Sequence, residues 1–271
     1  MFADDAKIYR SIQSADDHSV LQADLMKLDQ WSKTWLLTFN PEKCKVMHFG
    51  DRNMNHGYTM KGIALATTER EKDLGVLLTP SLKPSAQVAQ VVAAASAMLG
   101  RIKRTFTCMD QEMFMSLYKS LVRPRLEYAV QTWNPYLQKD ITKLEKIQRR
   151  ATKLVPALAD LPYEERLRRL ELTTLQERRH RGDLIQVFKI LKGIDLVNAG
   201  DKFLQLQAGP RRHRTRGHPL KLSKPRHRTH KRNMFFSSRV VDSWNNLPED
   251  VVMSRTISTF KKKLDQHMSK Q

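Results

Sequence analysis

Hydrophobic residues follow two different periods along this chain, and the change comes near residue 84. Before that point, one apolar stripe predicts an amphipathic helix over about residues 15–37. Ser14 and Asp17 have capping-box spacing at its start, and Asn40-Pro41 is expected to stop it. The stripe consists of Leu21, Leu25, Leu28 and Trp35. Short apolar or alternating segments predict strands at residues 7–9, 45–49, 57–65 and 74–78.

After Pro84 the apolar spacing becomes helical. Three stripes predict three successive helices, and the second should end before Arg123-Pro124. Thr174 and Glu177 form another capping box, which opens a helix that Gly193 should end. The four stripes are Val88, Val92, Ala95, Leu99 and Ile102; Phe114, Leu117, Tyr118 and Leu121; Ile141, Leu144, Ile147, Ala151 and Leu154; and Leu184, Phe188 and Leu191. A small antiparallel sheet with one helix, followed by a mainly helical region, predicts an α+β fold.

The helical pattern is interrupted at residues 208–233. Between Arg211 and Arg232 there are ten Lys/Arg, four His and no acidic residue, and three prolines discourage regular structure. We therefore expect a flexible basic segment here, at least without a bound partner. Residues 234–248 then form an apolar patch, and a last helix should turn Phe260 and Leu264 inward.

Charge is the strongest compositional signal, with a formal net charge of +20. Residues 1–60 carry a net −1, residues 101–150 a net +6 and residues 201–271 a net +12. Such a cationic end predicts RNA or DNA as the partner. No run of about 18 apolar residues is present, so no membrane partner is expected. The widely separated Cys44 and Cys108 and the absence of a visible signal peptide favour nucleus or cytoplasm over secretion.

Asp4 and Asp5 are the first candidates for chemistry. Two adjacent carboxylates in a tight turn between strands can hold Mg²⁺ through oxygen ligands, and such ions support phosphoryl transfer. The alternative is an exposed acidic pair near a frayed terminus. The histidines of the basic segment match no common zinc-site spacing, and no cysteine lies near them.

The motifs that follow Asp4-Asp5 narrow this choice. Phe2-Ala3-Asp4-Asp5 resembles the catalytic turn of reverse transcriptases, and further motifs follow in the family's order and spacing. These are residues 37–47, the Lys72-to-Val76 hairpin similar to a primer grip, residues 118–129, 133–135 and 181–185, and the patch at 236–248. Together they resemble the reverse transcriptase of non-LTR retrotransposons of the jockey-like LINE type.

This resemblance implies an organisation and an activity. It implies a partial reverse transcriptase palm at 1–80, a helical thumb at 84–155, a helical connector at 156–200 and a basic nucleic-acid-binding region at 201–271. It also implies an RNA-directed DNA polymerase that copies element RNA at a target site. In the family, a third metal-binding Asp, the fingers and an endonuclease domain precede the Asp pair. We therefore expect a C-terminal portion that binds Mg²⁺ weakly or not at all and is inactive alone.

Several further residues become candidates. Lys43, with Lys45 as the alternative, has the position of the Lys near the leaving pyrophosphate in related polymerases, and Gly75 would lie under the primer end. A thumb cluster of cations could follow nucleic-acid phosphates, or be a solvated face. Its members are Arg101, Lys103, Arg104, Lys119, Arg123 and Arg125. The basic segment adds Arg211, Arg212, Arg214, Arg216, Lys231 and Arg232.

Three functional hypotheses remain. The first is a reverse transcriptase portion that keeps the catalytic turn but needs the missing parts. The second is a nucleic-acid-binding module without catalysis. The third is a degenerate relic of a retroelement. Supplying the missing parts in trans separates the first from the second. Tyr118, Tyr128 and Trp133 could stack on bases, but core packing is the favoured role of these aromatics.

Overall fold

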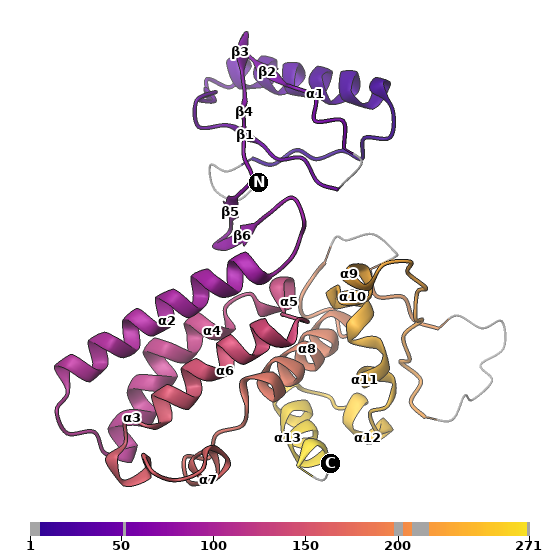
Figure 1. Cartoon of the computed structure of the whole chain (residues 1–271). Coiled ribbons are helices and arrows are strands. Elements are labelled where there is room, and N and C mark those ends of the chain that lie inside the picture. Colours follow the sequence, from indigo (N-terminus) through magenta and orange to yellow (C-terminus); the bar gives the residue numbers. More distant parts are fainter. Residues whose placement is uncertain (1–5, 51–52, 198–202, 208–216, 270–271) are drawn as a thin grey trace. The chain divides into compact units, whose positions relative to one another are not determined.

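The computed structural model describes residues 6–50, 53–197, 203–207 and 217–269. The chain divides into two compact units, Met1–Ala86 and Gln87–Gln271. Figure 1 shows mixed strands and helix in the first and helices in the second. The α+β class is therefore confirmed, whereas the assignment to palm, thumb, connector and C-terminal region stays a prediction. None of the helices in the described ranges has the length and apolarity needed to cross a bilayer.

The first unit consists of one long helix and six very short strands. Their bounds are α1 (Ala15–Thr34), β1 (Lys45–Val46), β2 (Thr59–Met60), β3 (Ile63–Ala64), β4 (Ala66–Thr67), β5 (Glu71–Asp73) and β6 (Val76–Leu78). The expected strand at residues 7–9 is not formed. The strands make three separate two-stranded sheets, and β1–β4 is parallel, so the expected single antiparallel sheet is wrong. Ladders of two or three residues leave too few neighbours to merge into one sheet.

Helix α1 begins where the sequence predicts and ends sooner. The Asp17 carboxylate accepts from the backbone N–H groups of Gln13 and Ser14, and these bonds lower the pKa of Asp17. The helix stops at Thr34, so Trp35 lies outside it and is 65% exposed. Gln22 ties α1 to β2, because its side chain donates to the Thr59 carbonyl at 2.8 Å and accepts from the Thr59 N–H at 2.9 Å.

The apolar core of the first unit is small. Among its described residues the buried hydrophobic side chains are Tyr58, Met60 and Val76. Of the predicted apolar stripe, Leu21, Leu25 and Leu28 are half-buried and Trp35 is exposed. Trp31, Leu36 and Leu37 are exposed as well. Helix α1 instead buries Asp29 and Ser32, and a polar buried face explains why hydrophobic periodicity alone places its end wrongly.

The second unit is helical, apart from one isolated β-bridge. Its elements are α2 (Ser85–Thr105), α3 (Gln111–Leu117), the π-helix η1 (Tyr118–Val122), α4 (Arg123–Glu127), α5 (Val130–Trp133), α6 (Gln138–Thr152), the 3₁₀-helix η2 (Pro156–Leu158), α7 (Tyr163–Arg169), α8 (Leu175–Leu191), α9 (His230–Asn233), α10 (Phe236–Arg239), α11 (Val241–Asn245), α12 (Glu249–Val252) and α13 (Ile257–Met268). The predicted helices at α2, α6, α8 and α13 are confirmed.

A π-helix corrects the expected stop before Arg123-Pro124. The Arg123 N–H donates to the Tyr118 carbonyl, five residues earlier, and α4 continues with Pro124 in its first turn. Proline lacks a backbone N–H, but a residue in the first turn of a helix does not need this donor for a helical hydrogen bond. The helix therefore continues through Pro124. The buried side chains consequently recur every fourth residue, at Phe114, Tyr118, Val122 and Leu126.

A buried polar network holds the helices of this region in register. Tyr118 donates to Gln148 Oε1 at 2.5 Å, and Gln148 Nε2 donates to the Thr173 carbonyl at 3.0 Å. Tyr163 hydrogen-bonds Glu145, whose other oxygen accepts from the Leu175 N–H at 3.1 Å. Burial raises the pKa of both tyrosines above the usual range. The network fixes η1, α6, α7 and the start of α8 together, since unmade bonds here are costly.

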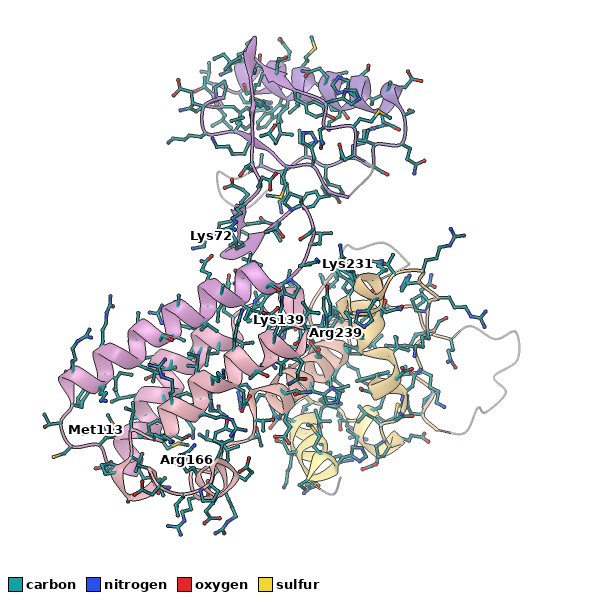
Figure 2. The ribbon with its side chains drawn as sticks, in the orientation of Figure 1. Lys72, Met113, Lys139, Arg166, Lys231 and Arg239 are labelled. Carbon is teal, nitrogen blue, oxygen red and sulfur yellow. The ribbon has the colours of Figure 1, made fainter. Side chains whose placement is uncertain are left out.

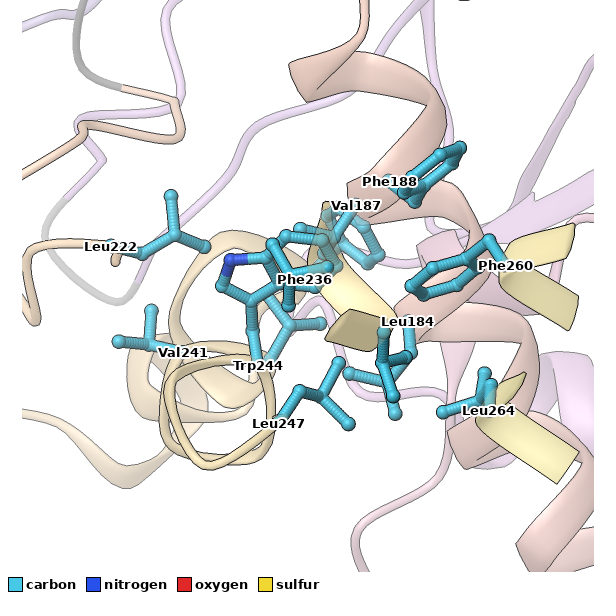
Figure 3. Close-up of a cluster of buried hydrophobic side chains, with 13 residues drawn as sticks. Leu184, Val187, Phe188, Leu222, Phe236, Val241, Trp244, Leu247, Phe260 and Leu264 are labelled. Carbon is cyan, nitrogen blue, oxygen red and sulfur yellow. The ribbon is translucent and has the colours of Figure 1, made fainter. Parts of the chain in front are cut away.

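The C-terminal helices enclose an aromatic core beside α8. Figure 3 shows Trp244, Phe236 and Phe260 in one cluster with Phe188 of α8. The rings of Phe188 and Phe260 stack with centroids 4.2 Å apart. Phe260 and Leu264 of α13 are fully buried, as predicted. The Thr174–Glu177 capping box is confirmed as well, with Thr174 accepting from the Glu177 N–H at 3.2 Å.

The described part of the basic segment is ordered against this core, so the expectation of a flexible segment is wrong for residues 217–233. Leu222 is fully buried, and the Asn245 side chain holds its N–H and carbonyl at 2.7 and 2.8 Å. His218 lies 3.0 Å from the Trp244 carbonyl, and Trp244 Nε1 donates to the Leu220 carbonyl. Apolar residues that lie between the cations in the sequence hold this segment against the core, and counting charges alone does not reveal them.

One buried ion pair joins α8 to the C-terminal helices. Arg239 of α10 binds Asp183 of α8 through two bonds of 2.9 Å each, with side chains 13% and 5% exposed. The remaining Arg239 donors reach the carbonyls of Gln131 and Met234. Such a forked pair is strong when all its partners are in place.

We predict that Arg239→Met lowers the free energy of unfolding by about 3–5 kcal/mol, because Asp183 is left buried without its partner. Urea titration of the purified chain measures this. Lys224→Met is the matched control, since the Lys224–Asp242 pair has side chains 61% and 65% exposed and should change stability little. Equal losses in the two variants would contradict the assigned role of the buried pair.

Candidate nucleic-acid interface

The proposed catalytic pair lies outside the described residues. Asp4 and Asp5 therefore stay a sequence prediction, as does their role in holding Mg²⁺. Within the described ranges, no group of three or more His, Cys, Asp or Glu side chains could hold a metal ion.

Lys43 and Gly75 both occupy turns of the first unit. Lys43 is exposed in the turn before β1, where its N–H donates to the Asn40 carbonyl at 3.2 Å. Gly75 and Leu74 form the two-residue loop of the β5–β6 hairpin, with φ of +84° and +46°. Two consecutive positive φ values are typical of a type I′ turn, in which glycine is strongly favoured. The predicted hairpin is confirmed, while its role under a primer end stays a prediction.

The six predicted thumb cations do not form one cluster. Helix α2 runs in one direction and α3, η1 and α4 return (Figure 1). Arg101, Lys103 and Arg104 lie at the far end of α2, whereas Arg123 and Arg125 lie near the opposite end of this hairpin. Arg123 is also half-buried, and burial together with nearby Arg178 lowers the pKa of its guanidinium.

The remaining thumb cations and aromatics have separate surroundings. Lys119 is exposed, and Arg125 Nε donates to the Leu121 carbonyl at 3.1 Å. Tyr118 and Trp133 are 1% and 4% exposed, which confirms the core role for both. Tyr128 is 58% exposed, so the core role is wrong for this residue, and base stacking stays a prediction.

The basic segment is only partly within the described ranges. Arg211, Arg212, Arg214 and Arg216 lie outside them, and their role in binding nucleic acid stays a prediction. Lys231 and Arg232 are exposed on α9, where the Arg232 guanidinium lies 4.7 Å from the centre of the Phe235 ring.

A row of exposed cations at helical spacing runs along α6 to its C-cap residue Lys153 and was not among the predicted sites. We call it the α6 stripe, and its members are Lys139, Lys143, Lys146, Arg150 and Lys153. All five are exposed, and Lys139 at its start is labelled in Figure 2. Their spacing of 4, 3, 4 and 3 residues places them on one helical face, next to the face that buries Leu144 and Ile147.

The stripe has the dimensions of a phosphate-binding surface. The fourteen steps from Lys139 to Lys153 rise by about 21 Å, and one strand of duplex carries a phosphate about every 3.4 Å of its axis. Lys143 Nζ lies 3.6 Å from the buried Asp140 carboxylate, which offsets part of the charge at that position. Arg149, on a neighbouring face, contacts the Tyr163 ring and Glu164 instead. The same spacing is visible in the sequence, so a search for cations at helical intervals finds it.

Comparison with known proteins gives two related sequences. The chain is 24% identical over 177 residues to the RNA-directed DNA polymerase from mobile element jockey of Drosophila melanogaster, and equally to that of Drosophila funebris. Each match covers 63% of this chain and 19% of the relative. The chain is a distant relative of the jockey-type reverse transcriptases. No family model and no solved structure matches it.

The relationship to the jockey enzymes agrees with the motif order read from the sequence. The chain spans about a fifth of the length of these relatives. The jockey relatives' names describe an RNA-directed DNA polymerase, and for this chain that activity belongs to the proposal below. What the described residues contribute is a cationic helical surface on the second unit.

We predict that Lys139→Gln, Lys146→Gln and Arg150→Gln together reduce the dependence of nucleic-acid binding on salt. Each phosphate contact contributes about 0.7–0.9 to the slope of log K against log salt, so the slope should fall by about 2–3. Fluorescence anisotropy with single- and double-stranded oligonucleotides between about 50 and 200 mM salt measures it.

The matched control removes three exposed cations elsewhere in the second unit, Arg255, Lys261 and Lys262, by the same change to Gln. The control should keep most of the slope. Equal reductions in the two triple variants would contradict a binding surface on α6 and assign the binding to net charge alone.

Proposed function

We propose that the chain is part of the RNA-directed DNA polymerase of a non-LTR retrotransposon, which copies element RNA into DNA at a target site. In this proposal the first unit supplies the catalytic turn and the second holds the RNA and DNA. The distant similarity to the jockey enzymes, over 177 residues, is the observation that carries it. We further propose that the chain extends no primer by itself.

The chemistry proposed for the first unit rests on few residues. Asp4 and Asp5 are proposed to hold Mg²⁺, which would activate the primer hydroxyl and neutralise charge at the leaving group. Lys43 is proposed to lie near the pyrophosphate, and its exposed position leaves the side chain accessible. The hairpin at Gly75 is proposed to support the primer end.

Two features of the first unit support inactivity alone. Its described core consists of three buried apolar side chains, and Trp31, Leu36 and Leu37 are exposed. Three separate ladders of two or three residues with so small a core position catalytic groups poorly, and a loss of positioning costs most of the rate enhancement. The exposed apolar residues support packing of this unit against further polypeptide of the polymerase.

Primer extension tests this proposal. With template, primer, Mg²⁺ and nucleotides, the chain alone should give no product. Adding the fingers and earlier palm strand of a jockey enzyme in trans should restore extension, and Asp4→Ala should abolish it. Asp16→Ala, which removes an exposed carboxylate of α1, is the matched control and should leave extension unchanged. Extension by the chain alone that disappears with Asp5→Ala would contradict the inactive state.

A second candidate function is a nucleic-acid-binding module without catalysis. The α6 stripe favours this function, because the stripe lies wholly within the second unit and includes no residue of the catalytic turn. The two functions separate in the same experiment. Salt-sensitive binding without any restored extension would assign the chain to the binding module.

A further inference from the structure

A cavity of about 170 Å³ lies beside α8, among residues of the α5–α6 connection, α6, α10 and α11. Its polar lining residues are Asn134, Gln176, Arg179, His180, Asp183, Arg239 and Ser243. The volume is several times the roughly 30 Å³ that a water molecule takes up in the liquid. Gln176 and His180 are exposed, so this side of the cavity opens to solvent.

Two of the three charges in the cavity wall neutralise each other. Asp183 receives both Arg239 bonds of 2.9 Å, and Asn134 Nδ2 donates to the same carboxylate at 3.3 Å. The guanidinium of Arg239 is occupied by this carboxylate and two backbone carbonyls. The Asp183–Arg239 pair therefore has little hydrogen-bonding capacity or net charge left for a ligand.

Arg179 is the third charge, and its compensation is incomplete. The residue is 3% exposed, and its Nε donates to Asn134 Oδ1 at 3.1 Å. Its Nη2 is closed off from solvent and has no hydrogen-bond partner in the described part of the chain. The ion pairs found nearby among the described residues join Glu127 to Arg178 and Asp183 to Arg239, and neither of them includes Arg179. Burial lowers the pKa of the Arg179 guanidinium, and the more distant charges of Glu145, Asp183 and Glu127 offset this only in part.

A buried cation without a counter-ion is costly, and proteins pair such groups. We propose that this cavity is a binding site for a phosphate oxyanion, held by the Arg179 guanidinium, with His180 and Gln176 at its mouth. The planar donor fork of arginine matches the geometry of phosphate oxygens. The phosphate could belong to free inorganic phosphate or to the end of a nucleic acid. The site needs only residues of the second unit, so it stands independently of the proposed polymerase function.

Thermal unfolding of the full chain tests the site. Inorganic phosphate, compared with chloride and with acetate at constant ionic strength, should raise the Tm saturably by about 3 °C or more. Arg179→Met should remove this rise, whereas Arg255→Met, which loses an exposed charge, should keep it. Without phosphate Arg179→Met should be as stable as the parent chain, because it removes an uncompensated buried charge.

The outcomes decide between a ligand site and a structural arginine. A purely structural Arg179 predicts that Arg179→Met lowers the Tm equally with and without phosphate, and this would overturn the proposal. A parent chain without a saturable phosphate effect, or with an equal acetate effect, would overturn it too. Should Arg179→Met fail to fold, His180→Ala at the exposed mouth should fold normally and need several-fold more phosphate for half of the rise.

The source of the phosphate is tested with oligonucleotides that differ only at the 5′ end. Tighter binding of the 5′-phosphorylated strand, by about tenfold and only with Arg179 present, assigns a nucleic-acid terminus. Equal binding of the two strands, with the Tm effect intact, assigns free phosphate. A fivefold or larger preference that survives Arg179→Met would place the terminal phosphate elsewhere and overturn the assignment of this cavity to nucleic acid.

Discussion

Helix α8 is the element that the packing of the second unit depends on, because polar bonds and apolar contacts leave it in several directions. Asp183 receives the buried Arg239 fork from α10, and Arg178 binds Glu127 of α4. Arg181 binds Asp265 of α13 through its two nitrogens. Leu184 and Phe188 belong to the aromatic core. A helix with few free faces holds its neighbours in fixed positions, which is what an extended binding surface requires.

The two units differ in how they are stabilised, and this bears on function. The second has a buried polar network at Gln148, a buried ion pair at Asp183 and an apolar core around Trp244. The first has short ladders, the Gln22 clamp on Thr59 and exposed apolar side chains. The α6 stripe and the Arg179 cavity therefore belong to a body that holds its own shape. The proposed catalytic turn belongs to the unit with the small core and the exposed apolar side chains.

Short-range patterns in the sequence correctly predicted the features that depend only on residues close together in the chain. The Thr174–Glu177 capping box, the Leu74–Gly75 hairpin loop and the inward Phe260 all follow from short-range spacing. Periodicity placed the end of α1 wrongly because that helix buries Asp29 and Ser32. It also missed the π-helix, since a five-residue hydrogen bond has no apolar signature.

Polar partners that are far apart along the chain could not be predicted from the sequence. Nothing local connects Asp183 with Arg239 or Asn134 with Arg179, because these pairs are separated by 56 and 45 positions. The order in residues 217–233 was missed for the same reason, as Leu222 is held by Asn245 from a later helix. Within the candidate site, the sequence predicted the hairpin and the exposed cations. Which cations lie together could be seen only from the arrangement of the helices in three dimensions.

Native-state hydrogen exchange tests the central claim, that α8 joins α6 and α13 into one cooperative body, most directly. The slowest amides of the three helices should give opening free energies that agree within about 1 kcal/mol, because they open together in global unfolding. Opening of α13 at a free energy several kcal/mol below that of α6 would contradict the account, since the C-terminal helices would then be a separate, weakly held segment.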